Sequence, residues 1–205
     1  MHCSKMAEPI IYIDFKSPAA YLAWKPTMAL LAEQSVSATW LPAQTRQRPI
    51  APQKADESKT ETHFRVREIA RQTMHLHYAE VQGIPMKFRE KPGDTDLALA
   101  AMLYAGAAGE TLLINFIENA FRAYWEMQQD LNDAQQVEQL LEQSGLPANL
   151  FDAEAWLARL AETAAQALDR GAIDAPAYVI GEQLFIGREH LPWIKELLQG
   201  SADTL

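Results

Sequence analysis

The order of strand and helix signals constrains this chain more than any other feature of its sequence. Residues 10–15 (IIYIDF) are β-branched and aromatic, which is typical of a buried strand. Ser17 follows at once, with Pro18 at the first helical position, and this pair favours a helix start. Residues 36–42 carry a second strand signal. The chain is therefore predicted to open as strand, helix, strand.

Helix signals fill the middle of the chain. A proline-containing loop is predicted over 44–60, and apolar residues then recur at helical spacing from about His63 until Gly83-Ile84-Pro85 ends the pattern. Further helices are predicted over 96–108, 110–127, 133–144 and 152–170, the last ending at Gly171.

Strand signals return at the end of the chain. Residues 176–180 and 183–187 are predicted to pair as a hairpin across Gly181-Glu182, and a closing helix is predicted over 190–198. A helical block inserted into one α/β domain explains this order better than two independent domains would.

Composition excludes several classes of protein. A net charge of −9 argues against general nucleic-acid binding, which depends on neutralising phosphates. The single cysteine, Cys3, excludes an internal disulfide and a redox Cys-x-x-C pair. No apolar run is long enough to span a membrane, and the first ten residues lack the apolar core of a secretory signal. We therefore expect a cytoplasmic protein with no nucleic-acid or membrane partner.

Positive charge is concentrated between Arg46 and Lys91, although the chain as a whole is acidic. One interpretation is a solvated face, which is how most charged residues are used. The other is a local field that attracts a small anionic ligand. The sequence leaves both open.

Few residues carry a recognisable chemical signature. His75 and His77 are two positions apart on a predicted helix, which points them to different sides, so a histidine metal site is not predicted. Ser17 stands at a helix N-terminus, where free N–H groups and the helix dipole favour an anion, although it could equally serve only as a cap. Ala175-Pro176, at the start of a strand, suits a cis peptide, although most X-Pro bonds in proteins are trans.

These segments together resemble one family. Residues 14–21 (DFKSPAAY) are similar to the opening of the DsbA-like thioredoxin-fold proteins of the kappa-class glutathione transferase and 2-hydroxychromene-2-carboxylate isomerase group. Residues 121–125 and 130–133 resemble the helical insertion of that group, 171–180 its cis-proline segment, and 184–191 the stretch that follows. The resemblance runs in the same order through most of the chain.

The resemblance implies an α/β thioredoxin-like fold with a large all-helical insertion. On this basis residues 8–60 and 171–205 form the thioredoxin-like domain, and residues 61–170 form the inserted helical domain. It also implies a homodimer, by analogy.

The resemblance further implies glutathione as the cofactor. Ser17, which replaces the catalytic cysteine of other thioredoxin-fold proteins, would hydrogen-bond the glutathione sulfur and favour its thiolate. The residues that would hold the tripeptide are Ala175, Pro176, Gly187, Arg188 and Glu189. A weaker set that could line the pocket for an anionic or aromatic substrate consists of Tyr21, Arg46, Arg48, Lys54 and Trp125. Aromatic residues at helical spacing, such as Tyr21 and Trp125, more often belong to the core.

The implied activity is that of a glutathione-dependent isomerase or transferase acting on a small conjugated or aromatic electrophile. In the isomerases of this group, the thiolate is thought to add to the substrate, permit bond rotation and leave. The alternative is a thioredoxin-fold binding or chaperone-like protein without glutathione chemistry. Departures from the family pattern at Asp174, Glu189 and His190 favour this alternative. Disulfide exchange is disfavoured because residues 17–20 contain no cysteine.

Overall fold

A four-stranded mixed sheet forms the centre of the molecule. The structure is a computed structural model that describes residues 8–47 and 49–203, with side chains described as far as residue 199. The strand order is β2-β1-β3-β4. Strand β1 (Ile10–Ile13) pairs in parallel with β2 (Thr39–Pro42) and antiparallel with β3 (Ala177–Ile180), which pairs antiparallel with β4 (Gln183–Ile186). The predicted α/β class and the predicted order of elements along the chain, strand-helix-strand at the start and strand-strand-helix at the end, are confirmed.

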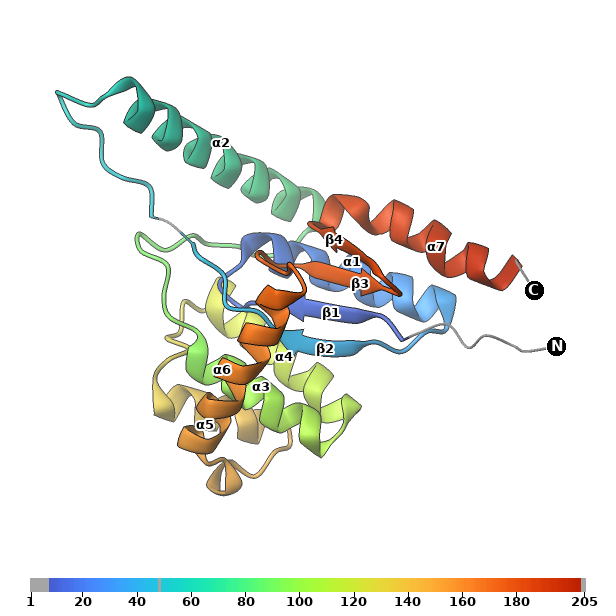
Figure 1. Ribbon diagram of the computed structural model, residues 1–205. Coiled ribbons are helices and arrows are strands. Elements are labelled where there is room, and N and C mark those ends of the chain that lie inside the picture. Colours follow the sequence, from blue (N-terminus) through green and yellow to red (C-terminus); the bar gives the residue numbers. More distant parts are fainter. Residues whose placement is uncertain (1–7, 48, 204–205) are drawn as a thin grey trace.

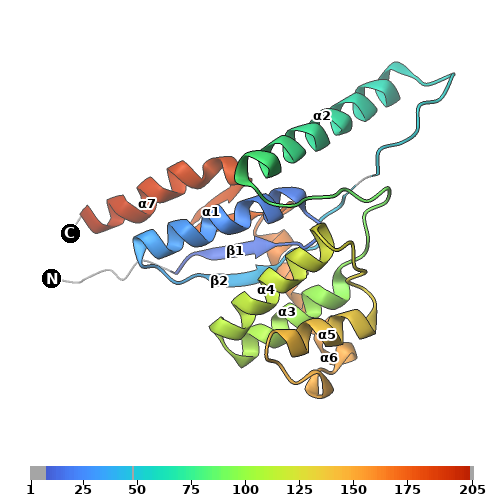
Figure 2. The same ribbon diagram turned by 180° about the vertical axis from the view of Figure 1, so that it is seen from behind.

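Two helices cover one face of this sheet. Helix α1 (Pro18–Gln34) begins at the predicted cap, where the Ser17 hydroxyl accepts a hydrogen bond from the Ala20 N–H. Helix α7 (Leu191–Asp203) follows a short 3-10 turn, η2 (Arg188–His190), and packs against α1. Figure 2 shows α1 and α7 on the same side of the sheet.

An inserted helical region lies between β2 and β3 in sequence. It consists of α2 (Lys59–Gln82), α3 (Asp96–Ala108), α4 (Glu110–Trp125), α5 (Ala134–Gln143), the 3-10 turn η1 (Ala148–Leu150) and α6 (Ala153–Asp169). Helices α3–α5 lie beside β2, and α6 lies on the face of the sheet opposite α1 (Figures 1 and 2). Within the described residues, no helix has the length and apolarity needed to cross a membrane.

The predicted loop over 44–60 is wrong at its end, because α2 starts earlier than its apolar pattern indicates. The Ser58 hydroxyl accepts from the Glu61 N–H while the Glu61 carboxylate accepts from the Ser58 N–H, which is a capping box. The predicted domain boundary between residues 60 and 61 falls inside this first helical turn. The division into two domains stays a prediction.

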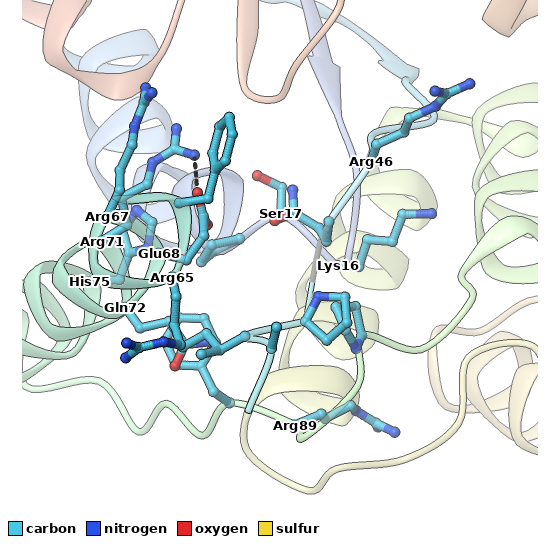
Figure 3. A pocket seen from close by; sticks show the side chains of 18 of the residues that line it. Lys16, Ser17, Arg46, Arg65, Arg67, Glu68, Arg71, Gln72, His75 and Arg89 are labelled. Carbon is cyan, nitrogen blue, oxygen red and sulfur yellow. Dashed lines mark hydrogen bonds and ion pairs between the residues drawn. The ribbon is translucent and has the colours of Figure 1, made fainter. Parts of the chain in front are cut away.

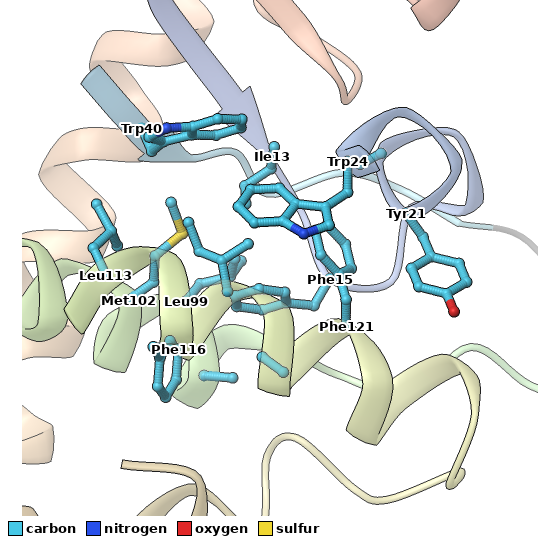
Figure 4. Packing of buried hydrophobic residues seen from close by; sticks show 14 of the residues in the cluster. Ile13, Phe15, Tyr21, Trp24, Trp40, Leu99, Met102, Leu113, Phe116 and Phe121 are labelled. Atoms are coloured by element: carbon cyan, nitrogen blue, oxygen red, sulfur yellow. The ribbon is translucent and has the colours of Figure 1, made fainter. Parts of the chain in front are cut away.

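The sheet and the inserted region share one aromatic core. Phe15, which follows β1, contacts Phe121 of α4 edge-to-face at 5.3 Å between ring centroids, and Trp24 of α1 contacts Trp40 of β2 at 5.0 Å. Figure 4 shows these rings packed over Leu99 and Met102 of α3. Burying each such side chain contributes about 1.5–3 kcal/mol. This shared core holds the N-terminus of α1 firmly against α4.

Candidate active site

A pocket of about 520 Å³ opens at the N-terminus of α1, a size within the usual range for small-molecule sites. Its walls come from the residues around Ser17, the loop after β2, one face of α2, and the segment from Phe88 to Pro92 together with the end of α4. In Figure 3, Ser17 lies between the side chains of α2 and those of Lys16 and Arg46. Segments far apart in sequence therefore meet at the predicted catalytic residue.

Ser17 is held by two hydrogen bonds. Its side chain is fully buried, its hydroxyl donates to the Ala175 carbonyl at 2.5 Å, and its oxygen accepts from the Ala20 N–H at 3.2 Å. Ala175 precedes Pro176, and the peptide bond between them is cis, which decides between the two forms that the sequence left open. The start of α1 is thus joined directly to the residue before the cis-proline.

Hydrogen bonds to Asp14 stabilise this turn. Its buried carboxylate accepts from the Thr45 N–H and hydroxyl and from the Thr95 hydroxyl, each at 2.8 Å, and its backbone carbonyl accepts from the Ser17 N–H. The Lys16 ammonium lies 3.6 Å from the same carboxylate. Burial raises the pKa of Asp14, and these partners offset only part of that effect. One carboxylate therefore links the end of β1, the loop after β2 and the start of α3.

Cationic side chains dominate the pocket walls. Arg65 is paired with Glu57 by two hydrogen bonds of 2.8 Å, Arg71 with Glu68 at 3.4 Å, and Lys54 with Glu61 at 3.8 Å. Seven lysines and arginines and four carboxylates line the pocket. This arrangement favours the second interpretation of the positive charge between residues 46 and 91, a local electric field that attracts an anionic ligand.

Arg46, Arg67 and Arg89 are cations of the pocket that lack a carboxylate partner within the part of the chain that the structure describes. Arg89 stacks over the Tyr124 ring at 4.7 Å and donates to the Gln129 carbonyl, while its buried Nε has no partner among the described residues. These three arginines are available to meet negative charge on a ligand.

Aromatic rings form the remaining wall. Phe88 packs edge-to-face on Trp125 at 5.3 Å, and the His75 imidazole stacks on Phe88 at 6.3 Å. Burial, followed by the charges of Arg71 and Arg188, lowers the pKa of His75 to about 4. His75 is therefore a neutral imidazole near pH 7. The pocket combines aromatic surface with positive charge.

The predicted site residues are only partly assembled at the pocket. Ser17, Arg46, Lys54 and Trp125 line it, and Arg48 lies outside the described residues, as does Cys3. Tyr21 is not at the pocket. It is buried, its ring stacks on Trp125, and its hydroxyl donates to the Pro85 carbonyl at 2.8 Å.

None of the predicted tripeptide-binding residues is among the residues that line the pocket. Ala175 contacts the Ser17 hydroxyl, and the Pro176 carbonyl accepts from the Gly187 N–H at 2.8 Å. The Arg188 guanidinium stacks over Tyr78 of α2 at 3.8 Å. Gly187 has a φ of 106°, and its Cα faces the Glu189 carboxylate. Asp174, noted as a departure from the family, does line the pocket.

Sequence reasoning missed His75 and Phe88 as pocket residues. His75 was considered only as a metal ligand, and no group of three or more metal-ligating side chains occurs among residues 8–47 and 49–203. The available signal for these two residues was the concentration of positive charge between residues 46 and 91, because that segment includes the whole of α2.

Comparison with known proteins finds one matching family and several solved structures with a similar fold but low sequence identity. Residues 10–199 match the model of a family described as DSBA-like thioredoxin domain. A search of curated proteins finds no match. A solved 2-hydroxychromene-2-carboxylate isomerase superposes with a TM-score of 0.73 at 18% identity, covering 96% of this chain and 98% of that one. A cytosolic disulfide reductase, DsbM, from Pseudomonas aeruginosa with GSH superposes with a TM-score of 0.65 at 17% identity, covering 96% and 98%. Identities this low establish the shared fold alone.

Proposed function

The chain belongs to the DSBA-like thioredoxin domain family, and from this membership we propose that it is a glutathione-dependent isomerase or transferase acting on a small conjugated or aromatic electrophile. One observation carries the proposal: a serine hydroxyl, not a thiol, stands at the N-terminus of α1 in the wall of a cationic and aromatic pocket. A helix N-terminus favours a thiolate that is brought to it. Reduced glutathione is a cytosolic thiol, so we also propose a cytoplasmic location.

The pocket suits the chemistry of glutathione. The tripeptide carries two carboxylates and one ammonium group, so its net charge is negative. Arg46 and Arg67 stand on opposite walls without carboxylate partners in the described residues and are the cations we assign to it. Asp174 is the lining carboxylate nearest in sequence to Ala175, and it is suited to an ammonium group.

An exchange of hydrogen bonds at Ser17 would accommodate the ligand. The Ser17 hydroxyl now donates to the Ala175 carbonyl. An amide N–H of a bound peptide can donate to that carbonyl instead, as an added strand would. The hydroxyl would then be free to turn and donate to the glutathione sulfur, while its oxygen still accepts from the Ala20 N–H. No buried polar group is left without a partner after this exchange.

The residues of the chain provide binding, orientation and charge. Glutathione, when bound, would supply a thiolate nucleophile that can add to and leave a conjugated substrate. Phe88, Trp125 and neutral His75 offer flat apolar surface for an aromatic ring. We assign to Lys16 and Arg89 the stabilisation of negative charge that develops on a substrate oxygen. Fixed positive charges are most effective in this role when water is excluded from the site. Disulfide exchange within the chain is not proposed, because the sequence has one cysteine.

The second candidate is a binding protein without glutathione chemistry. It is favoured by the fully buried Ser17 hydroxyl, which already has two hydrogen-bond partners. In this case the pocket would hold an anionic aromatic ligand or a peptide, and Ser17 would serve only the fold.

Calorimetric titration with reduced glutathione separates the two candidates. We expect the wild type to bind, and Ser17→Ala to bind more weakly. The matched control is Asp133→Ala, which removes the cap of α5 away from the pocket. A set of conjugated aromatic electrophiles is then assayed with and without glutathione. Absence of binding at millimolar glutathione would reject the enzyme and favour the binding protein.

A further inference from the structure

Helix α3 begins without a cap from its own N-cap side chain. Thr95 stands at the N-cap position, where a hydroxyl usually accepts a hydrogen bond from the first turn, but it makes no such bond. The first three N–H groups of α3 are satisfied by other acceptors, which are the Asp94 carboxylate, the Asn132 amide oxygen and the Leu131 carbonyl. The helix start therefore does not need the Thr95 hydroxyl, which is available for another contact.

That contact is with a buried carboxylate. Thr95 is fully buried, and its hydroxyl donates at 2.8 Å to one oxygen of Asp14, 81 positions away in the sequence. The other oxygen of Asp14 accepts from the N–H and the hydroxyl of Thr45, which is also buried. None of the three residues lines the pocket. We name Asp14, Thr45 and Thr95 the Asp14 network.

The Asp14 network holds two segments that do line the pocket. The Lys16 N–H donates to the Asp14 carboxylate at 3.2 Å, and the Ser17 N–H donates to the Asp14 carbonyl at 3.0 Å. Arg46 directly follows Thr45 in the sequence. Figure 3 shows the side chains of Lys16 and Arg46 on the side of Ser17 that faces away from α2. One carboxylate thus connects the segment that carries Ser17 with the segment that carries Arg46.

The position of Arg46 depends on this connection. Its side chain is exposed and has no ion pair within the part of the chain that the structure describes, so its backbone decides where the guanidinium can reach. Burying a carboxylate is costly, and hydrogen bonds offset that cost only when they are well formed. A fully satisfied buried network specifies one arrangement of the segments that it joins. The hydrogen bonds of Asp14 therefore fix Arg46 relative to Ser17.

We propose that Thr95 is a positioning residue for cofactor binding, which acts through Asp14 and Thr45 to set the separation between Ser17 and Arg46. This inference rests on the function proposed above, in which Ser17 meets the glutathione sulfur and Arg46 meets a carboxylate. Affinity is highest when both partners are held in advance at the separation that the ligand requires. The inserted helical region would then contribute to glutathione affinity through a residue that does not line the pocket.

A positioning role differs from a purely structural one in its dependence on Arg46. If Thr95 acts through Arg46, loss of its hydroxyl should weaken glutathione binding only while the arginine is present. A structural residue would instead weaken binding by the same factor with or without that arginine. Mutations at independent sites combine additively to within roughly a twofold change in affinity, which sets the resolution of the comparison.

A double-mutant cycle measures this dependence by calorimetric titration with reduced glutathione. Thr95→Val keeps the shape of the side chain without its hydroxyl and should weaken binding about threefold or more, beyond the roughly twofold limit of additivity. Thr95→Ser keeps a hydroxyl and should bind as the wild type does. In an Arg46→Gln background, Thr95→Val should have no further effect. Unchanged affinity in the single variant, or an equal loss in both backgrounds, overturns the proposal.

The matched control for a general loss of stability is Thr27→Val. Thr27 is a buried residue of α1 whose hydroxyl shares a hydrogen bond of 2.9 Å with the Tyr178 hydroxyl, and it does not line the pocket. Thr27→Val should lower the free energy of unfolding, as Thr95→Val does, but should leave glutathione binding unchanged. If Thr27→Val weakens binding by the same factor as Thr95→Val, lost stability explains both effects and the proposal fails.

Amide hydrogen exchange without any ligand separates this inference from the proposed function. The Thr45 N–H donates to the Asp14 carboxylate, so it should exchange faster in Thr95→Val than in the wild type or in Thr95→Ser. Equal exchange in the three proteins overturns the positioning role even if glutathione binds. Faster exchange in Thr95→Val, combined with no glutathione binding by the wild type, would reject the proposed function and the role in binding, while the link from Thr95 to Thr45 would stand.

Discussion

The Ser17 hydroxyl donates a hydrogen bond of 2.5 Å to the carbonyl of Ala175, a residue 158 positions away in the sequence. Both residues are buried. The bond joins the first turn of α1 to the segment that leads into β3, and so connects the opening and closing halves of the fold at the edge of the pocket. In the proposed enzyme the same two groups hold the sulfur and the backbone of glutathione.

Ser17→Ala should lower the free energy of unfolding by about 2–4 kcal/mol. Loss of an N-cap costs about 1 kcal/mol, and leaving the buried Ala175 carbonyl unsatisfied adds about 1–3 kcal/mol. Urea denaturation gives the value. Asp133→Ala is the control. Asp133 is the N-cap of α5, and its carboxylate accepts a hydrogen bond from the exposed Gln136 N–H. Equal losses for the two variants would show that the bond to Ala175 adds no stability.

Arg46→Gln should weaken glutathione binding about tenfold, the effect of losing one charge-assisted hydrogen bond. Arg46 has no carboxylate partner in the described part of the chain, whereas Lys54 lies 3.8 Å from Glu61. Lys54→Gln should therefore have a smaller effect. Calorimetric titration of both variants gives the comparison, and a larger loss for Lys54→Gln would contradict the assignment of Arg46.

The imidazole of His75 should titrate near pH 4, which NMR chemical shifts can measure. Burial and the charges of Arg71 and Arg188 lower its pKa from 6.5 to about 4. Between these values the unfolded chain holds a proton that the folded chain has released, so this residue makes stability rise with pH through that window. Arg71→Gln should raise the pKa of His75. The control is Arg159→Gln, which should leave that pKa unchanged, because Arg159 stacks on Trp156 in α6. A pKa that does not respond to Arg71→Gln would exclude that arginine as a cause.

Asp14→Asn should be more costly in acid than near neutral pH. Because burial raises the pKa of Asp14 above 3.8, the folded state keeps a proton that the unfolded state releases as the pH rises. The wild type therefore loses stability through this window, and the asparagine variant does not. Unfolding free energies of both proteins, measured from about pH 4 to about pH 7, should converge as the pH rises. A difference that grows with pH would mean that the hydrogen bonds from Thr45 and Thr95 outweigh burial.

Local signals predicted the framework of the fold. The Ser17-Pro18 start of α1, the left-handed residue Gly83 that ends α2 and the Gly181-Glu182 turn are all confirmed, because each depends on neighbouring residues alone. The start of α2 was missed because its capping box lies in polar sequence before the apolar pattern begins.

The pocket could be predicted only in part. The charge between residues 46 and 91 indicated an anion site, but the sequence could not show which arginines are paired within the chain. Tyr21 was predicted to line the pocket, yet its ring belongs to the core, because the helical turn after Ser17 points it toward Phe121 and Trp125. Such assignments depend on contacts between elements far apart in sequence.

The most direct test of the central claim is the pKa of the thiol of bound glutathione. Ultraviolet absorbance of the thiolate is followed against pH in saturating protein, in a Cys3→Ser background that removes the chain's own thiol. If Ser17 and the N-terminus of α1 stabilise the thiolate, the pKa should lie at least about one unit below the ordinary value of about 8.5 and should return toward it in Ser17→Ala. An unchanged pKa in the complex, or the same lowered pKa with and without the Ser17 hydroxyl, would contradict the role assigned to Ser17.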